Sequence, residues 1–259
     1  MKFSFTTYAL GQGKRWEELL PLAKKAGCAG LEFRTGGGHK HGVEVSLSTE
    51  ERKAVRRAFE DQYMEVSCLN SPHYLDSPDP AIRRAQIEGA KETCKLAADL
   101  GCGRIRLFGD SGESALDAQA RVELVAEGLR EIADFAAPLK VDALLEMHGF
   151  FNFWGYALSA VEKADHSNAM ILYNCDNRDL VGGSMRETFA RVRKYVRHIH
   201  THELDVYPYL QLFEEAHKMG YEGYFSAEIP DTTDPDYVLP LYITAMKALR
   251  DLASYTVAR

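Results

Sequence analysis

The residues Ala26-Gly27-Cys28-Ala29-Gly30 join a helix-like segment to a short apolar one, and similar joins occur twice more in the chain. The near copies are Leu100-Gly101-Cys102-Gly103 and Met219-Gly220-Tyr221-Glu222-Gly223. A glycine that follows a helix can take the left-handed backbone that ends it, and a second glycine frees the turn into the next segment. The repetition predicts a chain of similar units in which each helix leads into a strand.

Short apolar segments recur roughly 25 to 40 residues apart, and an amphipathic segment follows each of them. We predict strands that begin near Lys2, Ala29, Glu65, Arg104, Val141, Met170, Val196 and Tyr224. The length of 259 residues suits one barrel as well as two small domains, but no linker or change of composition divides the chain. We therefore predict an α/β fold in which residues 1–259 form a single (β/α)8 TIM barrel domain.

The expected helices carry start and stop signals. Ser48 and Glu51 form a capping box at the start of one helix, and Ser184 with Glu187 predicts another. Further helices are expected from Trp16 to Ala26, after Asp79-Pro80, from Tyr209 to Met219, and up to about Leu252. Pro240 is expected to bend or delay the last of these, because proline lacks the backbone N–H that a helix interior uses.

Composition and charge limit the classes of function. The formal net charge of −7 disfavours a nucleic acid partner, and no stretch is apolar enough to cross a membrane. The N-terminal residues lack the apolar run of a signal peptide. The five cysteines are odd in number and lie mostly in apolar segments, which is typical of reduced thiols. We therefore expect a cytoplasmic protein.

Polar residues end the last four predicted strands. Glu146, Asp176, His200 and Glu228 each lie at such an end, about one strand-helix unit apart. Barrel enzymes place their working residues at the C-terminal ends of the strands, so the four side chains are expected at one mouth. His200 lies in the stretch Arg197-His-Ile-His-Thr-His-Glu203, whose alternation puts three imidazoles on one face. The alternative interpretation of that stretch is a solvated edge.

The three carboxylates and the imidazole predict a metal site. Burying several carboxylates together costs several kcal/mol per ion unless a positive charge neutralises them. A divalent cation does this, and oxygen ligands with one imidazole suit Mn²⁺, our first choice, as well as Zn²⁺, Co²⁺ or Mg²⁺. The alternative is that each acid pairs with a nearby Arg or Lys.

This series resembles the metal site of the xylose isomerase-like barrel superfamily, which includes ketose 3-epimerases, hydroxypyruvate isomerases, inosose dehydratases and endonuclease IV. The stretch 198–203 looks like the His-x-His-x-x-Glu segment of the epimerases, whose second His binds metal and corresponds to His200. The resemblance implies a metal-dependent sugar isomerase or epimerase with Glu146, Asp176, His200 and Glu228 as ligands. The chain departs from the epimerase pattern at 176–179, where Asp-Asn-Arg-Asp replaces Asp-x-x-His, and at Val206, where those enzymes have an arginine.

A metal that binds a carbonyl and the neighbouring hydroxyl acidifies the adjacent carbon and stabilises an enediolate. Glu146 and Glu228 could then act as base and acid on opposite faces of that carbon. The substrate would be a small ketose or keto-polyol. Elimination of a β-hydroxyl would instead make the protein a dehydratase. An endonuclease IV-like nuclease, which needs further metal-binding histidines absent here, and a non-catalytic sugar-binding barrel are further alternatives.

Other polar residues are candidates for substrate binding. They are Glu32, His73, His148 and Arg178, together with His202 and Glu203 from the resembling segment. Structural hydrogen bonding or solvation is the alternative for each, because polar residues at a barrel mouth do either. Residues 36–42, with His39 and His41, suggest a mobile flap. The aromatic residues 150–154 could form a wall for a sugar or a contact in a homodimer.

Overall fold

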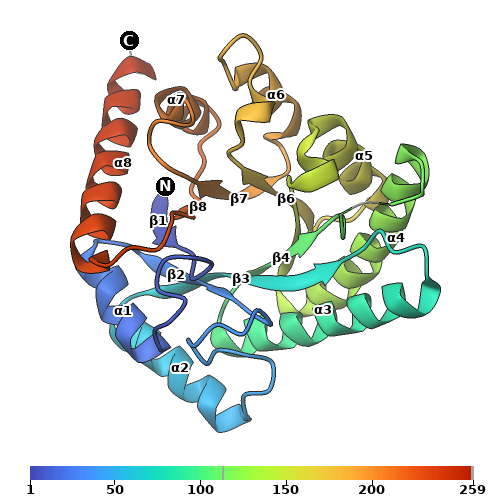
Figure 1. Ribbon diagram of the computed structural model, residues 1–259, viewed down its shortest axis with the longest axis horizontal. Coiled ribbons are helices and arrows are strands. Elements are labelled where there is room, and N and C mark those ends of the chain that lie inside the picture. The colour runs from blue at the N-terminus through green and yellow to red at the C-terminus, as the bar shows by residue number, and fades with distance from the viewer. Residues whose placement is uncertain (113, 258–259) are drawn as a thin grey trace.

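The computed structural model describes residues 1–112 and 114–257, and it contains a central ring of parallel strands surrounded by helices (Figure 1). The strands are β1 Lys2–Phe5, β2 Gly30–Arg34, β3 Glu65–Tyr74, β4 Arg104–Phe108, β5 Asp142–Glu146, β6 Ala169–Asn174, β7 Val196–Thr201 and β8 Tyr224–Ala227. Every predicted strand start is confirmed to within one residue. The repeated turn signals are local, so they can be placed from the sequence alone.

Each strand leads into a helix on the outside of the ring. The helices are α1 Trp16–Lys25, α2 Thr49–Asp61, α3 Pro80–Leu100, α4 Ala118–Ala136, α5 Trp154–Ala164, α6 Arg186–Val192, α7 Tyr209–Lys218 and α8 Pro235–Val257. Short 3-10 helices occur at η1 Ala137–Leu139, η2 Gly149–Asn152 and η3 Asn177–Asp179. Helix α8 lies beside α1, so the last unit of the chain is next to the first (Figure 1).

The glycine joints behave as predicted. Gly27, Gly101 and Gly220 have φ values of +76°, +73° and +66°, the left-handed region that ends a helix. The capping box of α2 is also confirmed, since Ser48 Oγ accepts the N–H of Glu51 while Glu51 Oε2 accepts the N–H of Ser48.

Two expectations about helix starts are wrong. Ser184 does not form a capping box with Glu187, because its hydroxyl donates to Gln211 Oε1 at 2.8 Å and α6 begins one residue after Met185. Helix α8 is not delayed by Pro240 but begins at Pro235 and contains Pro240. Pro240 is the sixth residue of α8, so it costs the helix the hydrogen bond that an N–H there would donate to the backbone oxygen of Asp236, without ending the helix.

The sheet closes into a barrel. Its hydrogen-bonded order is β1-β8-β7-β6-β5-β4-β3-β2, and every recorded pairing is parallel. A parallel bridge between Thr6 and Glu32 connects the two ends of that order, and Thr7 N–H donates to Glu32 O at 2.9 Å. The prediction of one (β/α)8 barrel is confirmed, and all C-terminal strand ends therefore open at one mouth.

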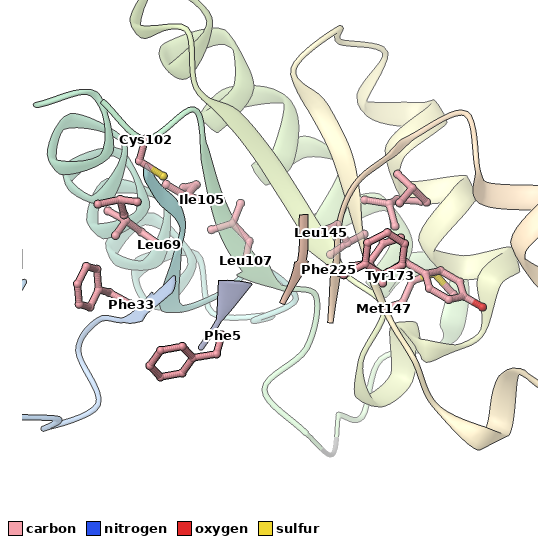
Figure 2. Close-up of a cluster of buried hydrophobic side chains, with 14 of the residues drawn as sticks. Phe5, Phe33, Leu69, Cys102, Ile105, Leu107, Leu145, Met147, Tyr173 and Phe225 are labelled. Carbon is pink, nitrogen blue, oxygen red and sulfur yellow. The ribbon is translucent and has the colours of Figure 1, made fainter. Parts of the chain in front are cut away.

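The hydrophobic core lies between the barrel and its helices. Side chains that point outward from the strands form it, and Figure 2 shows Phe33, Leu107, Tyr173 and Phe225 among them. Phe33 packs edge-on against Phe59 of α2, with ring centroids 5.9 Å apart. Strand residues alternate between two faces, so this outer layer commits the remaining side chains to the barrel interior.

The barrel interior is unusually polar. Only Leu144, Met170 and Leu172 form a separate apolar cluster within the described part of the barrel. Buried polar side chains on the strands include Ser4, Glu32, Asn70, Arg106, Glu146, Asn174, His198, His200 and Ser226. Buried polar groups are costly unless they are paired or serve a ligand, so the interior is the place to look for a site.

Among the described residues, no helix has the length and apolar character needed to cross a membrane. All five cysteines are buried and none is in a disulfide.

Candidate active site

Three of the four predicted metal ligands converge at the barrel mouth. Glu146 is the last residue of β5, His200 lies near the end of β7, and Glu228 follows β8 directly. His200 Nδ1 lies 3.2 Å from Glu146 Oε1 and 3.0 Å from Glu228 Oε2. One ligand atom from each residue lies within 4.8 Å of the others, close enough to share one ion.

The other side of the His200 ring is bound to Glu32. His200 Nε2 lies 2.6 Å from Glu32 Oε1, and His198 Nε2 lies 2.7 Å from Glu32 Oε2. All three side chains are buried. The Glu32 carboxylate can only accept, so the Nε2 atoms of both histidines carry the hydrogens. The neutral form of His200 therefore presents the lone pair of Nδ1 to Glu146 and Glu228, which is the arrangement of a metal-binding histidine held by a carboxylate behind it.

The charges in this group are strongly coupled. Burial alone would lower the pKa of His200, but Glu32, Glu146 and Glu228 together raise it well above its ordinary value. Burial would raise the pKa of Glu32, whereas His200 and His198 lower it well below the ordinary value. Without a metal, a protonated His200 is therefore the positive charge that balances the surrounding carboxylates.

The donor atoms of this group fit a divalent cation. His200 Nδ1 and Glu146 Oε2 are buried, and neither has a hydrogen bond of good geometry to any described residue. Unpaired buried polar atoms are rare and costly. Two carboxylates and one imidazole are ligands that Mn²⁺ and Zn²⁺ both accept.

The alternative to a metal site is that each acid pairs with a basic side chain, and Arg106 of β4 lies close to one of the acids, Glu146. Its Nε lies 3.5 Å from Glu146 Oε2, and its Nη1 donates to the backbone oxygen of Ser71 at 3.0 Å. Burial would raise the pKa of Glu146, but Arg106 and His200 lower it to about 2. Glu146 is therefore a carboxylate at neutral pH, available as a ligand or a base.

Asp176 lies outside this group. Strand β6 ends at Asn174, and Asp176 caps the short helix η3 by accepting the N–H of Arg178 at 2.8 Å. The same carboxylate receives Nη2 of Arg178 at 2.6 Å. Had the strand continued, Asp176 would have shared the inward face of Asn174. Two predicted site residues, Asp176 and Arg178, are thus bound to each other at the rim.

His148 and His202 line a small hollow directly above the ligand group. The hollow has a volume of about 230 Å³ and is bounded by Tyr8, Arg34, Arg106, Phe108, Glu146, His148, Asn174, His202 and Glu228. His202 Nε2 is held by Asn174 Oδ1 at 2.7 Å, and its Nδ1 lies 3.1 Å from the backbone oxygen of Glu228. His148 stacks at a tilt on Phe108, with ring centroids 5.3 Å apart.

The remaining candidates for substrate binding, Glu32, His73 and Glu203, do not line the small hollow. Glu32 is fully buried beneath His200, so its contacts correspond to the structural alternative. His73 lies against α3, where its Nδ1 is 3.1 Å from Gln86 Oε1. Glu203 is exposed after the end of β7. In the loop 36–42, His41 is buried and bonds to the backbone of Arg34 and Val43.

Sequence reasoning missed Arg34, Arg106, Phe108 and Asn174, all of which line the small hollow. Alternation could have found two of them. Arg34 is two residues beyond Glu32, and Asn174 is two residues before Asp176, so each shares a face with a residue that the sequence did single out.

A second group of possible ligand atoms lies deeper in the barrel and comprises Glu32, Cys68 and His198. Burial and the nearby Glu32 raise the pKa of the Cys68 thiol well above its ordinary value. A metal binds the thiolate, and the Glu32 carboxylate is already bound to two histidines. We therefore assign this deeper group a supporting role.

Solved structures of similar fold include sugar epimerases, a probable dehydratase and a protein with a bound zinc atom. A 3-keto-D-glucoside 4-epimerase from E. coli has 15% sequence identity and a TM-score of 0.81, with 96% of this chain and 99% of that chain covered. A probable 3-DHS dehydratase from Bacillus anthracis has 19% identity and a TM-score of 0.75, with 95% and 99% covered. The IOLI protein with a bound zinc atom has 16% identity and a TM-score of 0.78, with 98% of each chain covered.

At these identities the similarity concerns the fold. None of the curated proteins matches the sequence. The family model described as xylose isomerase-like TIM barrel matches residues 20–252, which is most of the chain and includes all four predicted metal ligands. The chain therefore belongs to the xylose isomerase-like TIM barrel family.

Proposed function

We propose that this protein is a divalent-metal-dependent isomerase or epimerase that moves a proton on a small ketose or keto-polyol. The observation that carries the proposal is the group of Glu146, His200 and Glu228 at a hollow of about 230 Å³, in which His200 Nδ1 faces both carboxylates within 3.2 Å. A wall of arginine, histidine and asparagine side chains suits the hydroxyl and carbonyl oxygens of a sugar.

Glu146, His200 and Glu228 would hold the ion, with Mn²⁺ as our first choice and Zn²⁺ next. Asp176 would be the fourth ligand once its carboxylate leaves Arg178. When bound, such an ion polarises a carbonyl oxygen and thereby acidifies the neighbouring carbon. Glu32 keeps the Nδ1 atom of His200 directed at the ligand position by accepting from Nε2.

Glu146 and Glu228 would transfer the proton. Glu146 ends β5 and Glu228 follows β8, and these strands are separated in the barrel by β6 and β7, so the two side chains approach the hollow from different sides. One would remove the proton from the carbon and the other would return it. Arg106, 3.5 Å from Glu146, would stabilise the negative charge that develops on a substrate oxygen.

The same proton removal could lead to loss of a β-hydroxyl, which would make the protein a dehydratase. The similarity in fold to a probable dehydratase is the reason that the experiment below also measures this product. Partners other than a small carbohydrate are not proposed, and the net charge of −7 disfavours a nucleic acid. We also propose a cytoplasmic location, which the five buried free thiols support. A homodimer through the aromatic loop is supported by Phe153, which is 53% exposed.

Elemental analysis of the purified protein, followed by incubation with ketoses and inososes in D₂O, tests this function. We expect close to one equivalent of divalent metal per chain and deuterium at a substrate carbon. A product that has lost one water would assign elimination instead of isomerisation. Absence of label from every substrate, in protein loaded with Mn²⁺ or Zn²⁺, would contradict the proposal.

The two proposed proton-transfer residues can be tested directly. Glu146→Gln and Glu228→Gln are each expected to reduce kcat about 10²- to 10⁴-fold, because an amide cannot accept the proton. Glu127→Gln on the exposed face of α4 is the matched control and should leave kcat unchanged. A near-normal kcat in either site variant would remove that residue from the mechanism.

A further inference from the structure

A second, larger hollow adjoins the small one at the barrel mouth. It has a volume of about 1010 Å³, and its lining residues include Tyr74, Phe108, Asp110, Arg121, His148 and Phe150. Phe108 and His148 line both hollows. The two hollows therefore adjoin at these two rings, which is where a ligand in the small hollow would extend into the large one.

The loops that bound the large hollow are fixed to each other. Asp110 follows β4, and its carboxylate accepts the backbone N–H of Phe150 from the segment after β5. Gly149 has φ +56°, and a Cβ at this position would lie 2.6 Å from Asp110 Oδ1. A side chain at position 149 would thus push the Asp110 carboxylate out of place. The close approach keeps this carboxylate at the lining of the hollow.

Arg121 of α4 connects the segment after β3 to the segment after β5. Its guanidinium donates to Asp76 Oδ2 from Nε at 2.9 Å and from Nη2 at 2.7 Å, and it lies over the Phe150 ring at 4.1 Å. Asp76 also accepts the N–H of Ser111 at 3.1 Å. The segments after β3, β4 and β5 are therefore joined by buried charged contacts, and the hollow is preorganised.

The lining has the chemistry of a sugar-binding surface. Tyr74 offers an aromatic ring, and such a ring suits the apolar face of a sugar. The Phe150 ring is covered by Arg121 at 4.1 Å and by the stacked ring of Tyr156 at 4.5 Å, so it supports the wall of the hollow. Asp110 offers a carboxylate for hydroxyl groups. Arg121 is already shared between Asp76 and Asp110, whose Oδ2 lies 3.6 Å from Arg121 Nη2, so these three side chains carry a net negative charge. An anionic group is therefore disfavoured there, and a neutral hydroxylated ring is favoured.

The volumes support a ligand of two parts. Ligand pockets typically have volumes of roughly 300–1,000 Å³. The small hollow, at about 230 Å³, is smaller than this range, and the large hollow, at about 1010 Å³, provides the additional space. We infer that the substrate is a glycoside whose reacting keto-sugar unit occupies the small hollow and whose second, neutral hydroxylated ring binds in the large hollow against Asp110 and Tyr74. This inference rests on the proposed function for the identity of the reacting unit.

Three ligands that differ only in the second group test it. They are 3-keto-glucosides with a methyl, a glucosyl or a phenyl group on the anomeric oxygen, and their Kd values are measured by calorimetry with Mn²⁺-loaded protein. We expect the glucosyl compound to bind at least about tenfold more tightly than the methyl compound, the effect of one or two hydrogen bonds to a carboxylate. The phenyl compound should gain less, because it cannot use Asp110.

Asp110→Asn and Tyr74→Leu should each reduce the ratio of the methyl to the glucosyl Kd to below about threefold. Asp251→Asn on α8 is the control for loss of one exposed carboxylate and should keep the wild-type ratio. Circular dichroism establishes that each variant is folded. A ratio near one in the wild-type protein, or a ratio that both variants retain, would overturn the inference.

A phenyl compound that binds as tightly as the glucosyl compound and is insensitive to Asp110→Asn would also overturn it, since the hollow would then select an apolar ring. Failure of the proposed function gives a different result. In that case the glucosyl preference and its dependence on Asp110 remain, but no deuterium enters any of the three compounds in D₂O.

Discussion

Glu32 connects two histidines that are more than 160 positions away in the sequence. Its two carboxylate oxygens lie 2.7 Å from His198 Nε2 and 2.6 Å from His200 Nε2. The sequence indicates a polar residue at the end of the second strand, but it does not indicate that strands β2 and β7 face each other across the barrel. Only the closed barrel brings these residues together, so the sequence alone leaves Glu32 open between a substrate contact and structural hydrogen bonding.

Glu32→Gln should weaken metal binding about 10- to 100-fold, the usual effect of removing a carboxylate behind a metal-binding histidine. An amide can accept from only one of the two histidines and no longer compensates the charge on His200. The Kd for Mn²⁺ is measured by competition with a chelator. Glu127→Gln is again the control, and an unchanged Kd in folded Glu32→Gln protein would show that Glu32 has no part in holding the metal.

Asp179 provides a separate prediction about pH. It is buried at the end of η3, and its Oδ1 accepts from Asn152 Nδ2 at 3.2 Å. Burial, with the nearby Asp176, raises the pKa of Asp179 from 3.8 to about 7. Between these two values the folded protein keeps a proton that the unfolded chain has lost, so the free energy of unfolding decreases as the pH rises through this range.

Asp179→Asn stays neutral at every pH and keeps the bond to Asn152, so it should stabilise the protein more at about pH 8 than at about pH 4.5. The upper limit of the difference is about 3 kcal/mol, from 1.36 kcal/mol for each pH unit between 4.5 and the pKa of about 7. Urea unfolding at the two pH values measures it. Asp251→Asn should show no comparable difference, and an equal effect of Asp179→Asn at both values would contradict the raised pKa.

At the scale of elements, the sequence predicts the strands well because each one is bounded by local signals. The helix-ending glycines and the capping box at Ser48 act within one turn, and both are confirmed. Ser184 has the same local pattern but a different outcome, because its hydroxyl is used by Gln211 of the neighbouring helix α7. A capping signal in the sequence therefore fails where a residue from another element forms a hydrogen bond with the same side chain.

The early end of β6 has a consequence for the metal site. Because the strand stops at Asn174, the Asp176 carboxylate caps η3 and pairs with Arg178. Arg178→Ala should tighten Mn²⁺ binding by up to about fivefold, since an exposed ion pair of at most about 1 kcal/mol no longer competes for the carboxylate. Asp176→Asn should weaken it. The Kd for Mn²⁺ of both variants measures this effect.

Arg193→Ala, an exposed arginine just beyond α6, is the control for loss of one positive charge. It should leave the Kd for Mn²⁺ close to the wild-type value. If neither Asp176→Asn nor Arg178→Ala differs from this control, Asp176 is not the fourth ligand, and Glu146, His200 and Glu228 hold the ion without it.

At the scale of the whole molecule, the metal group is formed at the ends of three strands in the second half of the barrel, β5, β7 and β8. Glu146, His200 and Glu228 belong to three units, and Glu32 adds a unit from the first half. The group is therefore formed only in the folded barrel, and an unfolded chain has no equivalent site. A ligand that binds only the folded state stabilises it by mass action.

Mn²⁺ at about 100 times its Kd should therefore add about 2.7 kcal/mol to the free energy of unfolding. For a domain of this size that corresponds to a rise in Tm of roughly 5 to 10 °C. Thermal unfolding after chelator treatment, with and without Mn²⁺, measures the rise. His200→Asn should abolish it, because the amide lacks the ring nitrogen that Glu32 directs at the ligand position, whereas Glu127→Gln should retain it. An equal rise in His200→Asn protein would place the stabilising ion elsewhere and remove the basis of the proposed chemistry.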